Sequence, residues 1–140
     1  MPIWSREITI EQLNQYIKNT MSEVLGMEFV EIGDDFLKAS MPVNERTRQP
    51  FGLLHGGANV ALAETVASMA ANGVIDPQKH YCVGLEINAN HLRAVKEGVV
   101  TAIATPIHLG RTTQVWEINI FDEGGKKTCV SRMTAAIVKR

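Results

Sequence analysis

The chain has 140 residues, of which 45% are hydrophobic and 21% charged, a composition typical of a folded globular protein and not of a disordered or collagen-like chain. A chain of this length corresponds to about one domain, so we expect residues 1–140 to form a single domain with one functional site. Fourteen basic residues stand against 15 acidic ones, and the formal net charge of −1 lacks the basic excess that binding to a phosphate backbone requires. Nucleic acid is therefore not an expected partner.

No stretch of the sequence is typical of export, membrane insertion or metal binding. The first residues lack the hydrophobic run of a signal peptide, and no segment is free of charge over the ~18 residues that span a membrane. We therefore expect a soluble cytoplasmic protein. Cys82 and Cys129 do not form a C-x-x-C pair, and the histidines are widely spaced. These patterns predict two buried thiols and no metal site.

The first third of the chain predicts one short helix and a β-hairpin. Thr9 and Gln12 have the spacing of a helix-capping box, and hydrophobic residues recur behind them at helical intervals. A short amphipathic helix is therefore expected to begin near Thr9. Further along, residues 28–32 and 36–41 have the texture of two strands, and residues 33–35 between them predict a tight hairpin.

Residues 55–73 predict the organising element of the fold, a buried helix. The stretch is rich in alanine, contains Glu64 as its one charge, and reaches Asn72-Gly73, which predicts a C-cap. The turns KEG, GRT and DEGG separate four later strand-like stretches, which predict an antiparallel meander: residues 81–92, 99–110, 113–121 and 128–138. About six strands of one sheet cannot surround such a helix, so either loops or a second subunit must cover the remainder. A second subunit is favoured, because closed symmetric dimers are the commonest oligomers.

The strongest candidate for chemistry is Glu64, because a carboxylate in the middle of a hydrophobic helix is costly to desolvate and no Lys or Arg lies three or four residues away. The alternative is that Glu64 lies on a narrow solvent-facing stripe. Gly56 and Gly57 would leave backbone N–H groups open to an oxyanion at the helix start, unless they merely end a loop. Ser68 shares a helix face with Gly57 and Glu64, and this combination of groups suggests acyl transfer.

Further polar residues lie near the predicted element ends. Gln49 and His55 flank the entry to the helix, where each could orient water or a substrate carbonyl or serve only as a loop residue. Cationic and hydroxyl side chains at strand ends could bind phosphates, although a solvated surface charge is the default for each. These candidates, with the glycine that accompanies them, are His91, Arg93, Lys96, His108, Gly110, Arg111 and Thr112.

Three stretches together form a specific pattern: residues 49–57 (QPFGLLHGG), 63–65 (AET) and 84–91 (GLEINANH). In these stretches, and over nearly its whole length, the chain resembles the hotdog-fold acyl-CoA thioesterases of the phenylacetate-degradation type. The resemblance implies an α+β fold in which a curved antiparallel sheet wraps around one long central helix. It also implies a homodimer or a dimer of dimers, with each site between subunits.

The same resemblance implies a function and a set of site residues. The implied reaction is hydrolysis of an acyl-CoA thioester without a cofactor, with aromatic acyl groups such as 1,4-dihydroxy-2-naphthoyl favoured and an acyl or aryl carrier protein as another source of thioester. Glu64 is implied as the catalytic carboxylate, Gly56 as the amide that polarises the carbonyl, and Gln49 as a positioning group. Ser68 and His55 are implied as supporting residues. The implied substrate- or coenzyme A-binding positions are Gly57, His91, Arg93, Gly110, Arg111 and Thr112.

Several alternatives stay open at this point. Glu64 could attack the thioester directly or act as a base on water. A hydratase or dehydratase of the same architecture would act at the 2,3 bond of the acyl chain. Such enzymes usually pair a His with an Asp or Glu at the start of the central helix, whereas the carboxylate here lies in the middle of the helix. A non-catalytic acyl-CoA binding protein would have no need of a buried Glu64.

Overall fold

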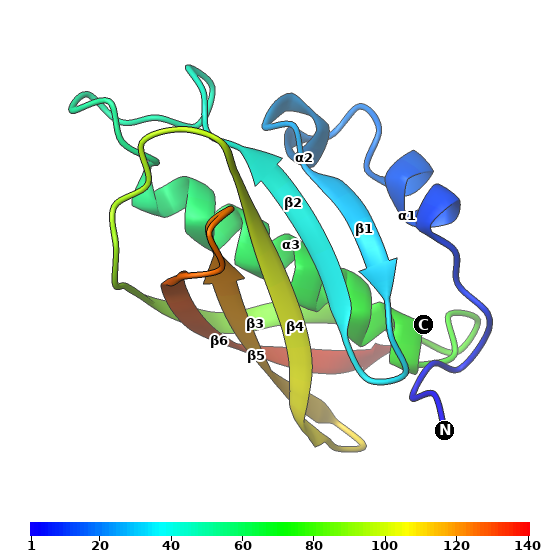
Figure 1. Cartoon of the computed structure of the whole chain (residues 1–140). Helices are drawn as coiled ribbons and strands as arrows, with labels where there is room; N and C mark the ends of the chain where they lie inside the picture. The colour runs from blue at the N-terminus through cyan, green and yellow to red at the C-terminus, as the bar shows by residue number, and fades with distance from the viewer.

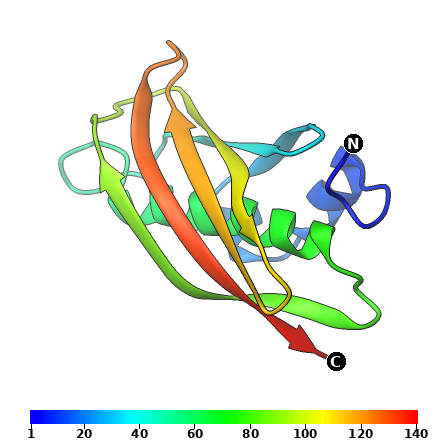
Figure 2. The ribbon, with the colours of Figure 1, turned by 90° about the horizontal axis from the view of Figure 1, so that it is seen from below.

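The computed structural model describes residues 1–140 and consists of one sheet and three helices. The long helix α3 (Gly56–Val74) lies on the concave side of the curved sheet (Figures 1 and 2). The short helices are α1 (Ile10–Tyr16), which packs on β1, and α2 (Met21–Val24), which packs on α3. The strands are β1 (Glu28–Ile32), β2 (Leu37–Pro42), β3 (His80–His91), β4 (Val99–Leu109), β5 (Thr113–Phe121) and β6 (Lys127–Lys139). The predicted α+β architecture, a curved antiparallel sheet around one central helix, is confirmed.

The core forms where α3 meets the sheet. Alternate residues of β5 point toward the helix, and Trp116, Ile118 and Ile120 are fully buried there. The facing side of α3 is built mainly from small residues, so the sheet can approach the helix closely. Its fully buried positions are Leu62, Ala63, Val66, Ala67, Ala70 and Ala71. The predicted buried helix is thus buried on its sheet side, whereas its other side is half-exposed.

Helix α1 begins where the capping box predicts. The Thr9 hydroxyl accepts a hydrogen bond from Gln12 N at 3.1 Å, and Gln12 Oε1 accepts one from Thr9 N at 3.1 Å. The predicted strands and the hairpin between β1 and β2 are also present. The four-residue helix α2 was not predicted, because a single turn leaves no periodic pattern in the sequence.

The predicted C-cap at Asn72-Gly73 is wrong, because α3 continues to Val74. Gly73 is instead a site of close packing, where an added Cβ would lie 3.1 Å from Trp4 Cε3. The Asn72 side chain is also occupied, since its Oδ1 accepts from Cys82 N at 2.9 Å and its Nδ2 donates to Cys82 O at 3.4 Å. Both residues therefore join the end of α3 to its neighbours.

The predicted meander is correct for β4, β5 and β6 but wrong for β3. The strand order is β1-β2-β4-β5-β6-β3, so β3 pairs with β6 at the outer edge and is far from β4. The chain leaves β3 and passes near the start of α3, where Val95 O accepts from Leu54 N at 2.8 Å, before β4 pairs with β2. None of the helices has the length and hydrophobicity needed to cross a lipid bilayer.

Candidate active site

The N-terminal end of α3 is organised by His55. Its Nδ1 accepts a hydrogen bond from Gly57 N at 2.8 Å, and this contact caps the helix. Of the two amides expected to be open, that of Gly57 is therefore occupied. Gly56 carries the helix-end amide that this cap leaves free for another acceptor. The sequence does not indicate which amide the histidine selects, because that depends on the side-chain rotamer.

His91, at the end of β3, packs against this same helix end. A Cβ added to Gly56 would lie 2.8 Å from His91 Nε2, so only glycine fits there without displacing the ring. The Nδ2 atom of Asn59 lies 3.3 Å from His91 Nδ1, and Asn59 is only 4% exposed. Sequence reasoning did not single out Asn59, although a polar residue among the alanines of this helix was a signal. Gly56, His91 and Asn59 together form what we call the amide end of the site.

Gln49 belongs to the loop that leads into α3. Its backbone N donates to Leu53 O at 2.8 Å, its carbonyl accepts from Gly52 N at 2.9 Å, and its side-chain oxygen accepts from Phe51 N. Gly52 has a φ of 81°, which glycine adopts freely. The tight turn leaves the Phe51 side chain 88% exposed. Gln49 thus lies close in sequence to the amide end. Its side-chain oxygen is occupied by its own loop, and its Nε2 group makes no hydrogen bond within the chain.

Glu64 lies midway along α3 and is half-buried. Its carboxylate lies against the backbone of β3 at Gly84, where an added Cβ would collide with Glu64 Oε2. The only ion pair in the structure joins Lys38 and Glu31, so Glu64 has no cationic partner. The carboxylate therefore packs against β3 in the space left by the missing Gly84 side chain, and no opposite charge holds it there.

Glu64 and Ser68 line one cavity of about 320 Å³ on the half-exposed side of α3. The Ser68 hydroxyl donates to Met133 Sδ at 3.6 Å, and the neighbouring Thr65 hydroxyl donates to Ala61 O at 2.7 Å. The expected sharing of one helix face by Glu64 and Ser68 is confirmed. Residues from α1, α2 and the connection between them complete the wall: Tyr16, Ile17, Thr20, Met21 and Ser22. We call this space the carboxylate cavity.

The amide end and the carboxylate cavity are too far apart to form one site within one chain. Gly56 and Glu64 are eight residues apart in α3, which at 1.5 Å per residue separates their backbones by about 12 Å along the helix. Their surroundings also differ, because the His91 ring packs at Gly56 whereas the Glu64 carboxylate lies against the backbone of Gly84. The two halves of the predicted chemistry are present but separate.

The expected coenzyme A positions fall into two groups. His91 and Arg93 lie at the end of β3, whereas residues 110–112 form the turn between β4 and β5. Strand β6 contacts both groups, since Cys129 pairs with His91 and Ile137 N donates to Thr112 O at 2.9 Å. These two β6 positions are eight residues apart, so the groups are separated by roughly 26 Å. One chain does not bring them together.

Both cysteines are buried and free, as the sequence predicts. Burial raises the pKa of the Cys82 thiol to about 11, and it raises the pKa of Cys129 as well. Both thiols therefore stay protonated at neutral pH, and a thiolate nucleophile is not part of this site.

Comparison with known proteins places the chain in a family. Residues 51–129 match the thioesterase superfamily model. The chain is 52% identical to the 1,4-dihydroxy-2-naphthoyl-CoA hydrolase of Escherichia coli, over 97% of this chain and 99% of that protein. It is also 52% identical to the proofreading thioesterase EntH of Cronobacter sakazakii, over 97% and 98% of the two chains. The crystal structure of a variant of thioesterase PA1618 from Pseudomonas aeruginosa has a TM-score of 0.97 and 51% identity, and covers 99% of each chain.

The chain belongs to the thioesterase superfamily, and its fold is the hotdog fold that the sequence resemblance implies. It is a thioester hydrolase, and the reaction class is hydrolysis of acyl thioesters. The family supports a small-molecule coenzyme A thioester as the class of substrate.

Proposed function

We propose that the protein hydrolyses aromatic acyl-CoA thioesters at a site that two subunits build together. The observation that carries the proposal is the separation of about 12 Å along α3 between Gly56 and Glu64. A carbonyl donor and a carboxylate that act on one thioester must both lie within a few ångströms of its carbonyl carbon. The amide end of one subunit therefore faces the carboxylate cavity of its partner.

The chemistry follows from the two halves. The Gly56 N–H donates to the thioester oxygen and stabilises the charge that develops there, an effect worth about 3 to 4 kcal/mol per donor. Gln49 orients the substrate at the same helix end. Glu64 supplies the carboxylate, which attacks the carbonyl carbon or removes a proton from the attacking water. Direct attack expels the coenzyme A thiolate and forms a mixed anhydride with Glu64, which water then hydrolyses to the free acid and the regenerated carboxylate. In the other route the activated water adds to the carbonyl carbon and the thiolate leaves. In both routes the thiolate takes up the proton that water gives up. Ser68 binds the attacking water in this proposal, which its position in the wall of the same cavity supports.

The acyl group lies in the carboxylate cavity. Its volume of about 320 Å³ is within the lower range of ligand pockets, and its wall includes Tyr16, Ile17 and Met69 beside Glu64. A flat hydrophobic ring suits such a lining. The relative that is named a 1,4-dihydroxy-2-naphthoyl-CoA hydrolase supports an aromatic acyl group for this chain.

Coenzyme A binds at the surface, with His91 and Arg93 near the amide end and Arg111 contributed by another chain. Gly110 and Thr112 form the turn that presents Arg111. A guanidinium pairs well with phosphate oxygens. An acyl or aryl carrier protein is a second source of thioester for the same catalytic groups, and side-by-side assays of the same acyl group on coenzyme A and on a carrier protein compare the two.

The decisive experiment is the substitution Glu64→Gln, assayed by release of free thiol from aryl and aliphatic CoA thioesters. We expect kcat to fall by on the order of 10² to 10⁴ while the oligomer stays folded. Glu117→Gln, which changes an exposed carboxylate on β5, is the matched control and should leave kcat unchanged. A Glu64→Gln rate within about threefold of the parent would remove Glu64 from the mechanism. Consumption of an enoyl thioester without thiol release would favour a hydratase, and retention of ligand without turnover a binding protein.

A further inference from the structure

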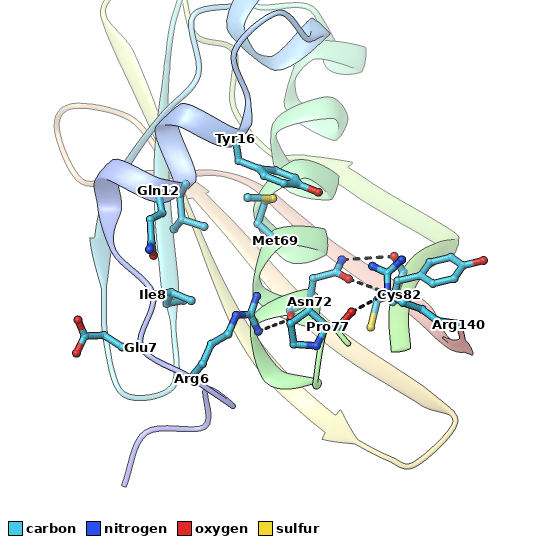
Figure 3. Close-up of a pocket in the computed structure, with 13 residues that line it drawn as sticks. Arg6, Glu7, Ile8, Gln12, Tyr16, Met69, Asn72, Pro77, Cys82 and Arg140 are labelled. Carbon is cyan, nitrogen blue, oxygen red and sulfur yellow. Dashed lines mark hydrogen bonds between the residues drawn. The ribbon is translucent and has the colours of Figure 1, made fainter. Parts of the chain in front are cut away.

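A second and larger cavity lies beside the C-terminal half of α3. It has a volume of about 630 Å³ and lies between the N-terminal segment, α1, the end of α3 and the start of β3 (Figure 3). Its wall is hydrophobic at one end, where Tyr16 and Met69 lie, and polar at the other, where Arg6, Asn72 and Arg140 lie. None of the roles assigned above involves this space, which we call the arginine cavity.

Two guanidinium groups in this cavity form no salt bridge with an Asp or Glu side chain. Arg6 Nη1 donates to Asn72 O at 3.3 Å and to Ile75 O at 3.2 Å, and Arg140 Nε donates to Pro77 O at 2.6 Å. These acceptors are neutral carbonyls, which fix the side chains without neutralising them. Glu7 also lines the cavity, but in Figure 3 its carboxylate extends away from the Arg6 guanidinium, which extends toward Asn72 and Pro77. Both cations therefore remain available to an anion.

The arginine cavity and the carboxylate cavity are adjacent and share lining residues. Tyr16 and Met69 line both spaces, and the lining of α3 runs along one side from Glu64 in the first to Asn72 in the second. Glu64 and Asn72 are eight residues apart, which is about 12 Å along the helix. A ligand that begins at Glu64 and passes Tyr16 and Met69 would reach the arginines at its far end.

We propose that the arginine cavity is a distal subsite for acyl groups that carry a carboxylate at the end remote from the thioester. The proposal rests on the proposed function, because it extends the acyl pocket of that same site. The hydrocarbon part of the acyl group packs between Tyr16 and Met69, and Arg6 and Arg140 form charge-assisted hydrogen bonds to the remote carboxylate. The subsite contributes binding and takes no part in bond breaking.

The size of the effect is limited by solvent. Arg6 and Arg140 are both exposed residues, so water and salt screen their attraction for an anion. We expect a preference of about three- to tenfold, which is less than a hydrogen bond to a buried charged group supplies and is close to the effect of an exposed ion pair. The preference should shrink as ionic strength rises, which a purely hydrophobic subsite would not show.

The experiment compares acyl-CoA thioesters of equal length that differ only in a terminal carboxylate. The pairs are hexanoyl with hexanedioyl, octanoyl with octanedioyl, and decanoyl with decanedioyl. For the parent, kcat/KM should favour the diacid in the longer pairs, which reach the arginines, and not in the shortest pair. The double substitution Arg6→Gln and Arg140→Gln should abolish the preference and leave hydrolysis of the monoacid thioesters unchanged. Arg132→Gln, an exposed arginine on β6, is the matched control and should keep it.

The outcomes separate the subsite from the proposed function. Equal kcat/KM for both members of every pair, or a preference that survives the double substitution, would overturn the subsite while hydrolysis itself stays intact. If the parent protein hydrolyses none of the thioesters, both the proposed function and the subsite are overturned. Because Arg6 also contacts the end of α3, unfolding of the double variant is checked by its thermal midpoint. The single variant Arg140→Gln then decides the question, and an undiminished diacid preference in it would also overturn the subsite.

Discussion

The glycine at position 84 of β3 helps to set the position of Glu64, because it has no side chain. Gly84 is the residue against which the Glu64 carboxylate lies, and any Cβ there would collide with Oε2. The colliding atom is the end of a flexible side chain, so the carboxylate can move aside without disturbing the core. A methyl group at this point would therefore change the position of the catalytic group and leave the fold intact.

We predict that Gly84→Ala lowers kcat with little effect on the thermal midpoint. Misplacement of a catalytic group by about 1 Å can cost up to 10²-fold in rate, and loss within that range is expected here. Gly124→Ala, in the turn between β5 and β6, is the control, because its Cβ would meet only Asp122 Oδ1 at 3.4 Å. A Gly84→Ala enzyme with parental kcat would show that Glu64 does not need its present position.

Arg93 and Arg111 should affect coenzyme A binding more than chemistry. Truncation of either to alanine is expected to raise KM for acyl-CoA and to leave kcat nearly unchanged, because binding is then lost equally from the ground state and the transition state. An N-acetylcysteamine thioester, which lacks the nucleotide, should be nearly indifferent to both changes. If that short ester slows as much as the CoA ester, both residues return to the status of ordinary surface charges.

At the scale of elements, helix α1 matters because it supplies a wall to both cavities. Tyr16 at its C-terminal end lines the carboxylate cavity and the arginine cavity alike. The helix has seven residues, too few to be stable alone, so its capping box and its packing on β1 hold it in place. A substitution at Thr9, the first residue of the capping box, should therefore destabilise α1 and disturb the cavity walls that Tyr16 forms.

Thr9→Ala is expected to lower the free energy of unfolding by about 1 kcal/mol, the usual cost of losing an N-cap side chain. The matched variant Thr9→Ser keeps the hydroxyl that accepts from Gln12 N and should retain most of that stability. Denaturant titration of the three proteins measures the difference. Equal stability of all three would mean that tertiary packing alone determines where α1 begins.

The sequence predicts where the helices and strands lie in the chain better than it predicts which of them are adjacent in space. Periodicity and capping residues are local signals, so the start of α1, the helix α3 and every strand could be located from the residues themselves. The pairing of β3 with β6 could not, because it depends on how the connection after His91 passes the start of α3. The wrong prediction of a C-cap at Asn72-Gly73 has the same origin, because it depends on residues that are distant in sequence. Trp4 packs against Gly73, and Cys82 N donates to the Asn72 side chain.

The candidate site was predictable in its residue types and only partly in its arrangement. Glu64 stood out because it is the one charge in α3, and Ser68 followed from helix geometry. The occupation of the Gly57 amide by His55 and the packing of His91 against Gly56 depend on side-chain rotamers, which the pattern does not encode. The separation of about 12 Å between Gly56 and Glu64 follows from their spacing of eight residues. Grouping the candidates by helix face alone did not take this distance along the helix into account.

At the scale of the whole molecule, the exposed edge of the sheet calls for a partner. Strand β3 has β6 on one side and no strand on the other, and it carries exposed hydrophobic side chains at Tyr81, Val83 and Leu85. Leu85 is the most exposed of these, at 62%. Long, unprotected edge strands of this kind readily pair with another chain. The edge therefore suits the second copy that the proposed two-subunit site requires.

We predict that Leu85→Lys yields a monomer in light scattering with little activity, since a charge opposes burial of the edge. Val30→Lys, at an exposed hydrophobic position on β1, is the control and should leave the oligomer and its activity unchanged. In a second arm, an inactive Gln49 variant is mixed with an inactive Glu64 variant. Activity should return, because each mixed dimer has one site with both residues intact. A fully active monomer, or no recovery on mixing, would contradict the two-subunit site.

The position of β6 between β5 and β3 also constrains how the chain reaches its native state during synthesis. Strand β3 leaves the ribosome well before β6, and β6 is the only strand with which it pairs. Until residues 127–139 emerge, the exposed hydrophobic positions of β3 have no neighbour on either side. Contacts between distant parts of a chain form slowly, and unpaired hydrophobic strands favour aggregation. Nascent chains stalled between β5 and β6 should therefore depend on chaperones far more than full-length chains do.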